Sequence, residues 1–216
     1  MTTTSTTLTT TPTQYPLIGS PSIMSQKTHG TSDVPIQAKL RFGANPKLAN
    51  RICNFNRHYA EPSGHFRKTK FVQQAKQLYE RDGKVVFYDS NTGKPLFVLD
   101  KNRNNNNTGR SWNAFIQEST AHGWPSFRDS EVVWEHVRCL PGGEAVSLDG
   151  THLGHNLPDA KGNRYCINLV SIAGFEKDNS KHEKTDNNTD EQQYKQQPNQ
   201  KAKRGIFRFL LSSRNA

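Results

Sequence analysis

The stretch that most constrains this chain is HLGHNLPDAKGNRYCIN, residues 152–168. It brings two histidines, an aspartate, an arginine, a cysteine and an asparagine into a span that one small loop can fold into a single site. Its second half, RYCINLVSI, is typical of a β-strand. Because side chains alternate along a strand, Arg164, Cys166 and Asn168 are predicted to share one face. That face is expected to carry chemistry, while the opposite face packs.

The neighbouring arginine gives the thiol of Cys166 a reason to ionise. A positive charge two residues away on the same strand face favours the thiolate, which is the nucleophilic form of cysteine. A single intracellular cysteine is more often a buried hydrophobic residue, and Cys166 considered alone fits that interpretation. The polar residues around Cys166 favour a reactive thiol over a buried hydrophobic residue. The sequence therefore predicts that Cys166 is a nucleophile.

Two separated motifs carry a resemblance to a known family. Gly-Trp-Pro-Ser-Phe occupies 123–127, and His-Leu-Gly-His at 152–155 precedes a loop with Asp159 and then Arg-Tyr-Cys-Ile-Asn at 164–168. In this order, the motifs resemble the B-type methionine sulfoxide reductases, the SelR-domain family, which reduce the R epimer of methionine sulfoxide. The likeness covers roughly residues 85–175.

The resemblance implies a role for each residue around the thiol. Cys166 matches the nucleophile that attacks the sulfoxide sulfur, and the matching residues around it are His152, His155, Asp159, Arg164 and Asn168. A histidine that titrates near pH 6.5 is able to protonate the sulfoxide oxygen. Asp159 is expected to orient a histidine or its water, and Asn168 to hydrogen-bond within the site. Without the cysteine, two histidines in a loop would belong to a solvated surface about as often as to a functional site.

The same resemblance implies a substrate wall. Trp124 matches the aromatic residue that receives the substrate methyl group, and Phe127 is the second expected substrate-binding residue. A tryptophan beside the rigid Pro125 offers the flat apolar surface that a methylthio group favours. Considered by itself, Trp124 is better explained as core packing.

The expected fold is mainly β. The resemblance implies two small antiparallel sheets of the β-tent or barrel-like methionine-R-sulfoxide reductase type, with minor helices and disordered tails. The residue pattern agrees. It predicts a hairpin from 85–88 and 95–99, strands at 132–138 and 145–148, a helix from Thr69 to Gly83, and a short amphipathic segment near Trp112.

Composition divides the chain into three parts. Residues 1–33 are rich in Thr, Ser and Pro and are expected to be a disordered leader, followed by a reductase-like domain at 34–175. An organelle transit peptide would be Arg-rich, and the first arginine is Arg41, so a cytoplasmic location is favoured. Residues 176–216 form a polar tail, also expected to be disordered. Its basic, apolar end is either unstructured, as favoured, or an amphipathic helix that contacts a membrane or partner.

Net charge and cysteine content limit the classes of partner and compartment that the chain is expected to have. The 216 residues carry a formal net charge of +10, which raises the expectation of an acidic partner. The charge is dispersed, however, so no nucleic-acid partner is expected. Three cysteines do not make a disulfide scaffold, which favours a reducing compartment. No apolar run approaches the length of about 20 residues that spans a membrane. We expect a soluble monomer.

The sequence departs from the family at its structural zinc, which the usual members hold with two Cys-x-x-Cys pairs. The first pair falls at Asp89 and Thr92, and the second at Cys139 and about Asp149. One thiolate, one hydroxyl and two carboxylates do not form a Cys₄ sphere. We expect no metal, and expect the 89–93 loop and the 139–149 segment to pack without one.

The expected reaction leaves Cys166 as a sulfenic acid that a thiol must reduce. Some family members place a resolving cysteine where this chain has His122. Cys53 and Cys139 remain as candidates, with Cys53, in a flexible lead-in, the more mobile. Either a Cys53–Cys166 disulfide is reduced by a thioredoxin-like partner, or an external thiol such as glutathione, alone or with glutaredoxin, attacks directly. No bound cofactor is expected.

The expected function is thiol-dependent reduction of methionine R-sulfoxide, protein-bound or free. One alternative is a cysteine hydrolase using Cys166, His155 and Asn168. Against it, the nucleophile lies within a strand, and no Gly-rich oxyanion turn precedes it. Another alternative is a binding module that has lost catalysis and uses its basic tails for RNA or a membrane surface. The intact catalytic set argues against a pure binder.

Overall fold

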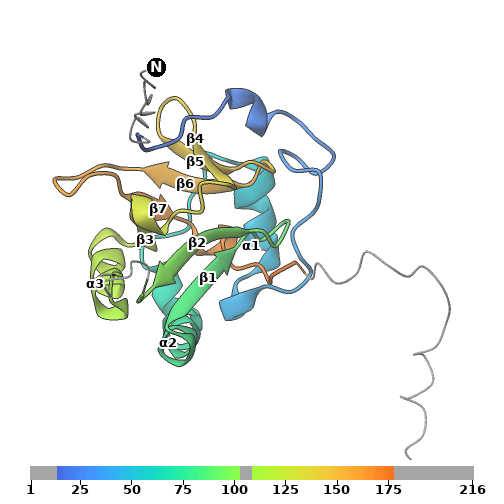
Figure 1. Cartoon of the computed structure of the whole chain (residues 1–216). Coiled ribbons are helices and arrows are strands. Elements are labelled where there is room, and N and C mark those ends of the chain that lie inside the picture. Colours follow the sequence, from blue (N-terminus) through green and yellow to red (C-terminus); the bar gives the residue numbers. More distant parts are fainter. Residues whose placement is uncertain (1–13, 103–108, 178–216) are drawn as a thin grey trace, which may run out of the picture. The chain divides into compact units, whose positions relative to one another are not determined.

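The computed structural model describes residues 14–102 and 109–177. They form two antiparallel sheets: a hairpin, and a five-stranded sheet in the order β3-β7-β6-β5-β4 (Figure 1). The strands are β1 (Lys84–Tyr88), β2 (Pro95–Asp100), β3 (Ser126–Phe127), β4 (Val137–Cys139), β5 (Glu144–Ser147), β6 (His152–Asn156) and β7 (Tyr165–Ile167). A mainly β fold with two small antiparallel sheets is therefore confirmed.

Helices are few and short. The longer ones are α1 (Pro46–Asn50), which continues as a π turn at Arg51–Phe55, α2 (Phe71–Asp82) and α3 (Trp112–His122). Single 3₁₀ turns lie at Pro21–Met24, Arg41–Gly43, His65–Lys68, Asp129–Glu131 and Leu169–Ser171. None of the helices in the described residues is both long and apolar enough to cross a membrane.

The predicted helix and hairpin both form. The hydroxyl of Thr69 accepts the N–H of Phe71, where α2 begins, and Gly83 ends the helix with a φ of 71°. β1 and β2 are joined by a turn in which Asp89 accepts the N–H of Asn91 at 2.8 Å. Local sequence alone decides these two elements.

The strand predicted at 132–138 is largely wrong, since β4 begins only at Val137. The N–H of Val133 donates to Leu96 on β2, and the N–H groups of His136 and Val137 both donate back to the carbonyl of Val133. These bonds close a turn before the strand can start. Contacts between the two sheets override the local alternation.

The strand predicted over RYCINLVSI also ends early, at Ile167. Just beyond it, the carboxylate of Glu61 accepts the N–H groups of Leu169 and Val170 at 2.9 and 2.8 Å. With these donors taken, the chain closes into a 3₁₀ turn at Leu169–Ser171 rather than extending the sheet.

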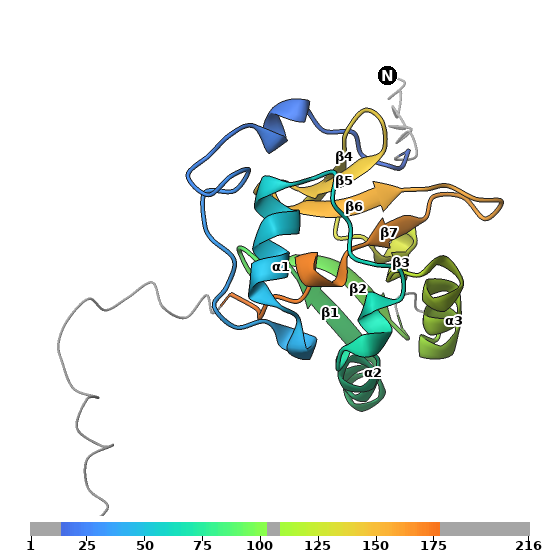
Figure 2. The same ribbon diagram turned by 180° about the vertical axis from the view of Figure 1, so that it is seen from behind.

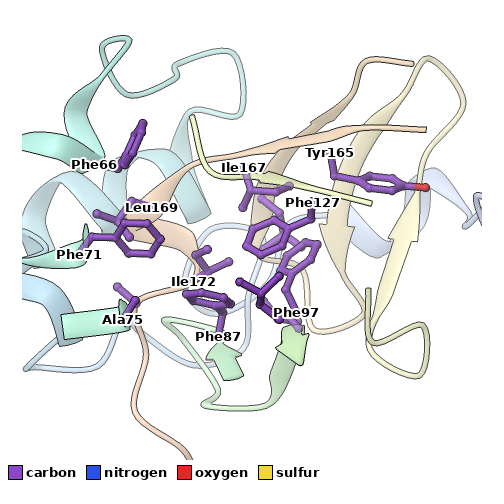
Figure 3. Packing of buried hydrophobic residues seen from close by; sticks show 14 of the residues in the cluster. Phe66, Phe71, Ala75, Phe87, Phe97, Phe127, Tyr165, Ile167, Leu169 and Ile172 are labelled. Carbon is purple, nitrogen blue, oxygen red and sulfur yellow. The ribbon is translucent and has the colours of Figure 1, made fainter. Parts of the chain in front are cut away.

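An aromatic cluster fills the space between the hairpin and the larger sheet (Figure 3). The rings of Phe97 and Phe127 stack with centroids 4.3 Å apart, and Phe87 meets Phe127 edge-on at 5.3 Å. Phe127 is fully buried, so its predicted role in substrate binding is wrong. Its place in the GWPSF motif reflects core packing, while Trp124 three residues earlier is only half-buried.

The disordered leader predicted for 1–33 is wrong for residues 14–33. The N–H of Gly19 donates to Cys139 at 2.8 Å, Met24 is buried, and the hydroxyl of Thr31 donates to Gly150 at 2.7 Å. The segment covers the outer edge of β4, an edge that would otherwise expose unpaired backbone groups. Residues 1–13 and the predicted tail from 178 onward lie outside the described residues.

We expect Phe127→Ala to lower the free energy of unfolding by about 3–5 kcal/mol, because a large aromatic side chain is removed from a closed core. Chemical denaturation measures the change. Phe55→Ala is the matched control: Phe55 is 62% exposed and its loss should change stability by less than about 0.5 kcal/mol. A Phe127→Ala protein as stable as wild type would contradict the core assignment.

Candidate functional site

Strand register aligns four polar side chains in one row across the larger sheet. Glu144 on β5 pairs with His155 on β6, His155 pairs with Cys166 on β7, and Cys166 pairs with Ser126 on β3. Directly paired residues project from the same face of a sheet. The thiol therefore lies between an imidazole and a hydroxyl.

The glycine of HLGH permits the close approach of β6 and β7. A Cβ atom at Gly154 would lie 2.0 Å from the carbonyl oxygen of Cys166, which no side chain tolerates. The motif thus needs glycine between its two histidines so that β6 can pair tightly with β7.

Arg164 and Cys166, predicted to share one strand face, are in contact. A guanidinium nitrogen of Arg164 donates to the sulfur of Cys166, and the hydroxyl of Ser126 lies 3.7 Å from the same atom. Arg164 is itself buried, so its charge is poorly screened by water. The arrangement sets a positive charge and a hydroxyl beside the sulfur.

Cys166 opens onto a cavity of about 380 Å³, a size common for small-molecule sites. His152, His155 and Cys166 line it from β6 and β7, and Trp124 and Asn168 contribute to its wall. Residues 57–60 also line the cavity, and they precede the stretch that resembles the family. Five of the predicted site residues are thus brought to one cavity.

His152 is held by a carboxylate that the sequence analysis missed. Its Nδ1 lies 2.8 Å from Glu144 Oε1, and Arg57 binds both oxygens of the same carboxylate, with Nε at 3.0 Å from Oε1. Burial opposes ionisation of Glu144, but the hydrogen bonds from His152 and Arg57 outweigh it and lower its pKa to about 2. An ionised carboxylate only accepts, so Nδ1 of His152 carries the hydrogen and Nε2 is left for chemistry.

Glu144 and Arg57 differ in how visible they are in the sequence. Glu144 begins β5, the strand that pairs with the HLGH strand β6. An acidic residue on a strand next to a histidine-bearing strand is a signal that the sequence contains. Arg57 lies 87 positions before Glu144 in the chain and no local pattern marks it. Only the fold brings it to the site.

His155 lies near His152, with ring centroids 5.7 Å apart. Partial burial, and then the neighbouring His152, lower the pKa of His155 below its ordinary value. His155 is therefore mainly neutral near pH 7.

Asp159, predicted to orient a histidine or its water, is bound by arginine side chains. Its two oxygens accept bonds from Arg128 at 3.0 and 2.8 Å, and Arg164 Nε lies 3.3 Å away. The hydrogen bonds from Arg128, and then the N–H of Lys161, lower the pKa of Asp159. Asp159 therefore contacts Arg164, which in turn contacts Cys166.

Asn168 lines the cavity, but its amide bonds to backbone. Its oxygen accepts the N–H of Glu61 at 3.0 Å, and its nitrogen donates to Leu153 at 3.1 Å. Trp124 is tied to the same place, since its indole N–H donates to the carbonyl of Glu61 at 3.1 Å. With its amide engaged in this way, Asn168 does not orient His155, so the hydrolase alternative loses its third residue.

The two candidate resolving cysteines are both buried. Cys53 is 1% exposed, and its thiol donates to the hydroxyl of Ser171 at 3.3 Å. Burial raises the pKa of the Cys53 thiol. Cys139 is 1% exposed in β4, and burial raises its pKa to about 11. The predicted mobility of Cys53 is wrong, and neither thiol lines the cavity of Cys166.

The residues at the family's zinc positions do not fit the metal. Both oxygens of Asp89 accept the hydroxyl of Thr151 at 2.9 Å, and Asp149 pairs with the ammonium of Lys94 at 2.9 Å. Cys139 belongs to the core cluster instead. Hydrogen bonds and an ion pair thus occupy the carboxylates that a metal would require.

In the part of the chain that the structure describes, one other group has metal-ligand spacing. Glu118, His122 and Asp159 place donor atoms within 4.8 Å of one another. Arg128, however, pairs with both carboxylates, and Arg110 also pairs with Glu118. These guanidinium groups supply the positive charge that a metal ion would bring to the two carboxylates.

Comparison with known proteins gives no relative against which to judge this geometry, because no family model, curated protein or solved structure matches the chain.

We expect Arg164→Met to slow alkylation of Cys166 by iodoacetamide at pH 7 roughly tenfold, because a charge-assisted hydrogen bond to the thiolate is lost. Peptide mass spectrometry assigns the label to Cys166. The control is Arg81→Met, since Arg81 is exposed on α2 and pairs only with Asp82 in the structure. An unchanged rate in Arg164→Met would show that the guanidinium does not activate this thiol.

The ion pair of Glu144 predicts a pH dependence of stability. Its folded pKa of about 2 lies below the ordinary value of 4.5, so its stabilisation is present above pH 4.5 and is lost as the pH falls toward 2. The unfolding free energy of wild type, relative to Glu144→Gln, should fall by roughly 2 kcal/mol between pH 5 and pH 3. Denaturant titrations at both pH values test this.

Proposed function

We propose that this protein reduces methionine R-sulfoxide to methionine, with Cys166 as the nucleophile. The observation that carries the proposal is one cavity lined by a thiol, two imidazoles and an indole, with a buried guanidinium bonded to the thiol. The motif resemblance to the B-type methionine sulfoxide reductases supports the same chemistry. That family then supplies the expected epimer and the order of steps.

The proposed first step moves one oxygen atom. The Cys166 thiolate attacks the sulfoxide sulfur while His152 gives a proton to the sulfoxide oxygen. Transfer of that oxygen leaves Cys166 as a sulfenic acid and releases the thioether, so the cysteine sulfur is oxidised as the substrate sulfur is reduced. Glu144 fixes the ring of His152 and stabilises the positive charge that it carries when protonated.

The walls of the cavity suit the substrate. Trp124 offers an apolar face for the methyl group, and Leu157, 48% exposed, adds apolar surface at the rim. Arg57 and His58 add polar groups to the cavity. A methylthio group and a polar S–O bond therefore each meet matching surroundings.

Burial of the other cysteines favours an external reductant. A thiol such as glutathione attacks the sulfenic acid of Cys166, forms a mixed disulfide and releases water; a second thiol then restores Cys166. Cys53 would have to leave the core beneath Ser171 to reach the same sulfur. We therefore favour the direct external route over an internal disulfide.

An assay with separate R and S epimers tests the proposed function. Wild type, supplied with a small thiol, should reduce the R epimer, and Cys166→Ser should lose activity at least about a hundredfold, as expected for removal of a nucleophile. Cys53→Ser is the control and should retain activity. Wild type that reduces neither epimer would end the proposal.

The reductant is tested by treating the protein with substrate and glutathione and then mapping its cysteines by mass spectrometry. We expect a glutathione adduct on Cys166 and no internal disulfide, because the other two thiols are enclosed. A Cys53–Cys166 or Cys139–Cys166 disulfide formed at the rate of turnover would contradict the external route.

A further inference from the structure

We propose that Glu61 is a positioning residue that sets where the tryptophan wall stands relative to the nucleophile strand, and thereby sets the affinity of the cavity for its substrate. This inference rests on the proposed function. Glu61 lies outside the stretch that resembles the reductase family, so the motifs give no indication of it.

Three separate groups of this one residue bind the site. The carbonyl of Glu61 accepts the indole N–H of Trp124 at 3.1 Å, and its own N–H donates to Asn168 at 3.0 Å. Its carboxylate accepts the N–H groups of Leu169 and Val170. Glu61 thus connects the substrate wall, the edge of the cavity and the turn that ends the nucleophile strand.

The segment that holds Glu61 is anchored at both ends. Arg57 binds Glu144 on β5, and Gly64 donates its N–H to the carbonyl of Gly123 at 2.7 Å. Figure 2 shows this segment passing from the end of α1 and its π turn across β6 and β7 toward α2. Residues 57–60 line the cavity between the two anchors. A shift of Glu61 would therefore move this wall and Trp124 together.

The carboxylate of Glu61 matches the two donors that it meets. Glu61 is 2% exposed, and its two oxygens meet two consecutive backbone N–H groups. Glutamine offers one acceptor and sets an NH₂ group against the second N–H, and alanine offers no acceptor. Unpaired buried donors would loosen the turn after β7. The number of hydrogen-bond acceptors at position 61 therefore falls from wild type to Glu61→Gln to Glu61→Ala, and the hold on the turn after β7 should weaken in the same order.

The experiment compares Glu61→Gln and Glu61→Ala with wild type in the full-length protein. Acrylamide quenching of tryptophan fluorescence reports on Trp124, because Trp112 and Trp134 are buried at 5% and 9% exposure. We expect quenching to increase from wild type to Gln to Ala. KM for methionine R-sulfoxide should rise roughly threefold in Gln and tenfold in Ala, while kcat changes less than twofold. Glu135→Ala, at an exposed position, is the matched control.

The outcomes separate this proposal from the reductase assignment. If wild type does not reduce sulfoxides, the assignment fails, and quenching together with alkylation of Cys166 still tests the positioning role. Quenching and KM equal to wild type in Glu61→Gln would overturn that role, as would a loss of kcat with KM unchanged. If Glu61→Ala does not fold, the Gln variant decides alone.

Discussion

The site depends on the register of β5, β6, β7 and β3. Pairing of Glu144 with His155, of His155 with Cys166, and of Cys166 with Ser126 sets the polar groups beside the thiol. A slip of one residue would turn each strand's side chains to the other face and disperse the row. Gly154 protects the register, because a larger residue there would collide with the carbonyl of Cys166.

Charge is distributed around this sheet in pairs. Arg57 pairs with Glu144 behind His152, and Arg128 pairs with Asp159 beside Arg164. The first of these pairs fixes the ring of His152, which lines the cavity, and the second contacts Arg164 through Asp159. Arg164 is different, since one of its guanidinium nitrogens donates to a sulfur rather than to an acid.

The site has two walls of different origin. Strands β6 and β7 with Trp124 form the wall that the motifs predict, while residues 57–60 form a second wall from an earlier, irregular segment. Glu61 and Arg57 attach this segment to the sheet at two points. Both segments line the cavity, so its volume depends on both.

The sequence by itself determined the elements with strong local signals: the hairpin around Asp89, the helix that begins near Thr69, and the alternation that faces Arg164 toward Cys166. Tertiary structure alone decided the burial and the contacts of Phe127, Asp159, Cys53 and Glu61, and it ended β7 at Ile167. The physical reason is that local pattern fixes backbone geometry and side-chain direction. Burial and hydrogen-bond partners, by contrast, come from residues distant in the chain, as with Arg57 and Glu144, 87 positions apart.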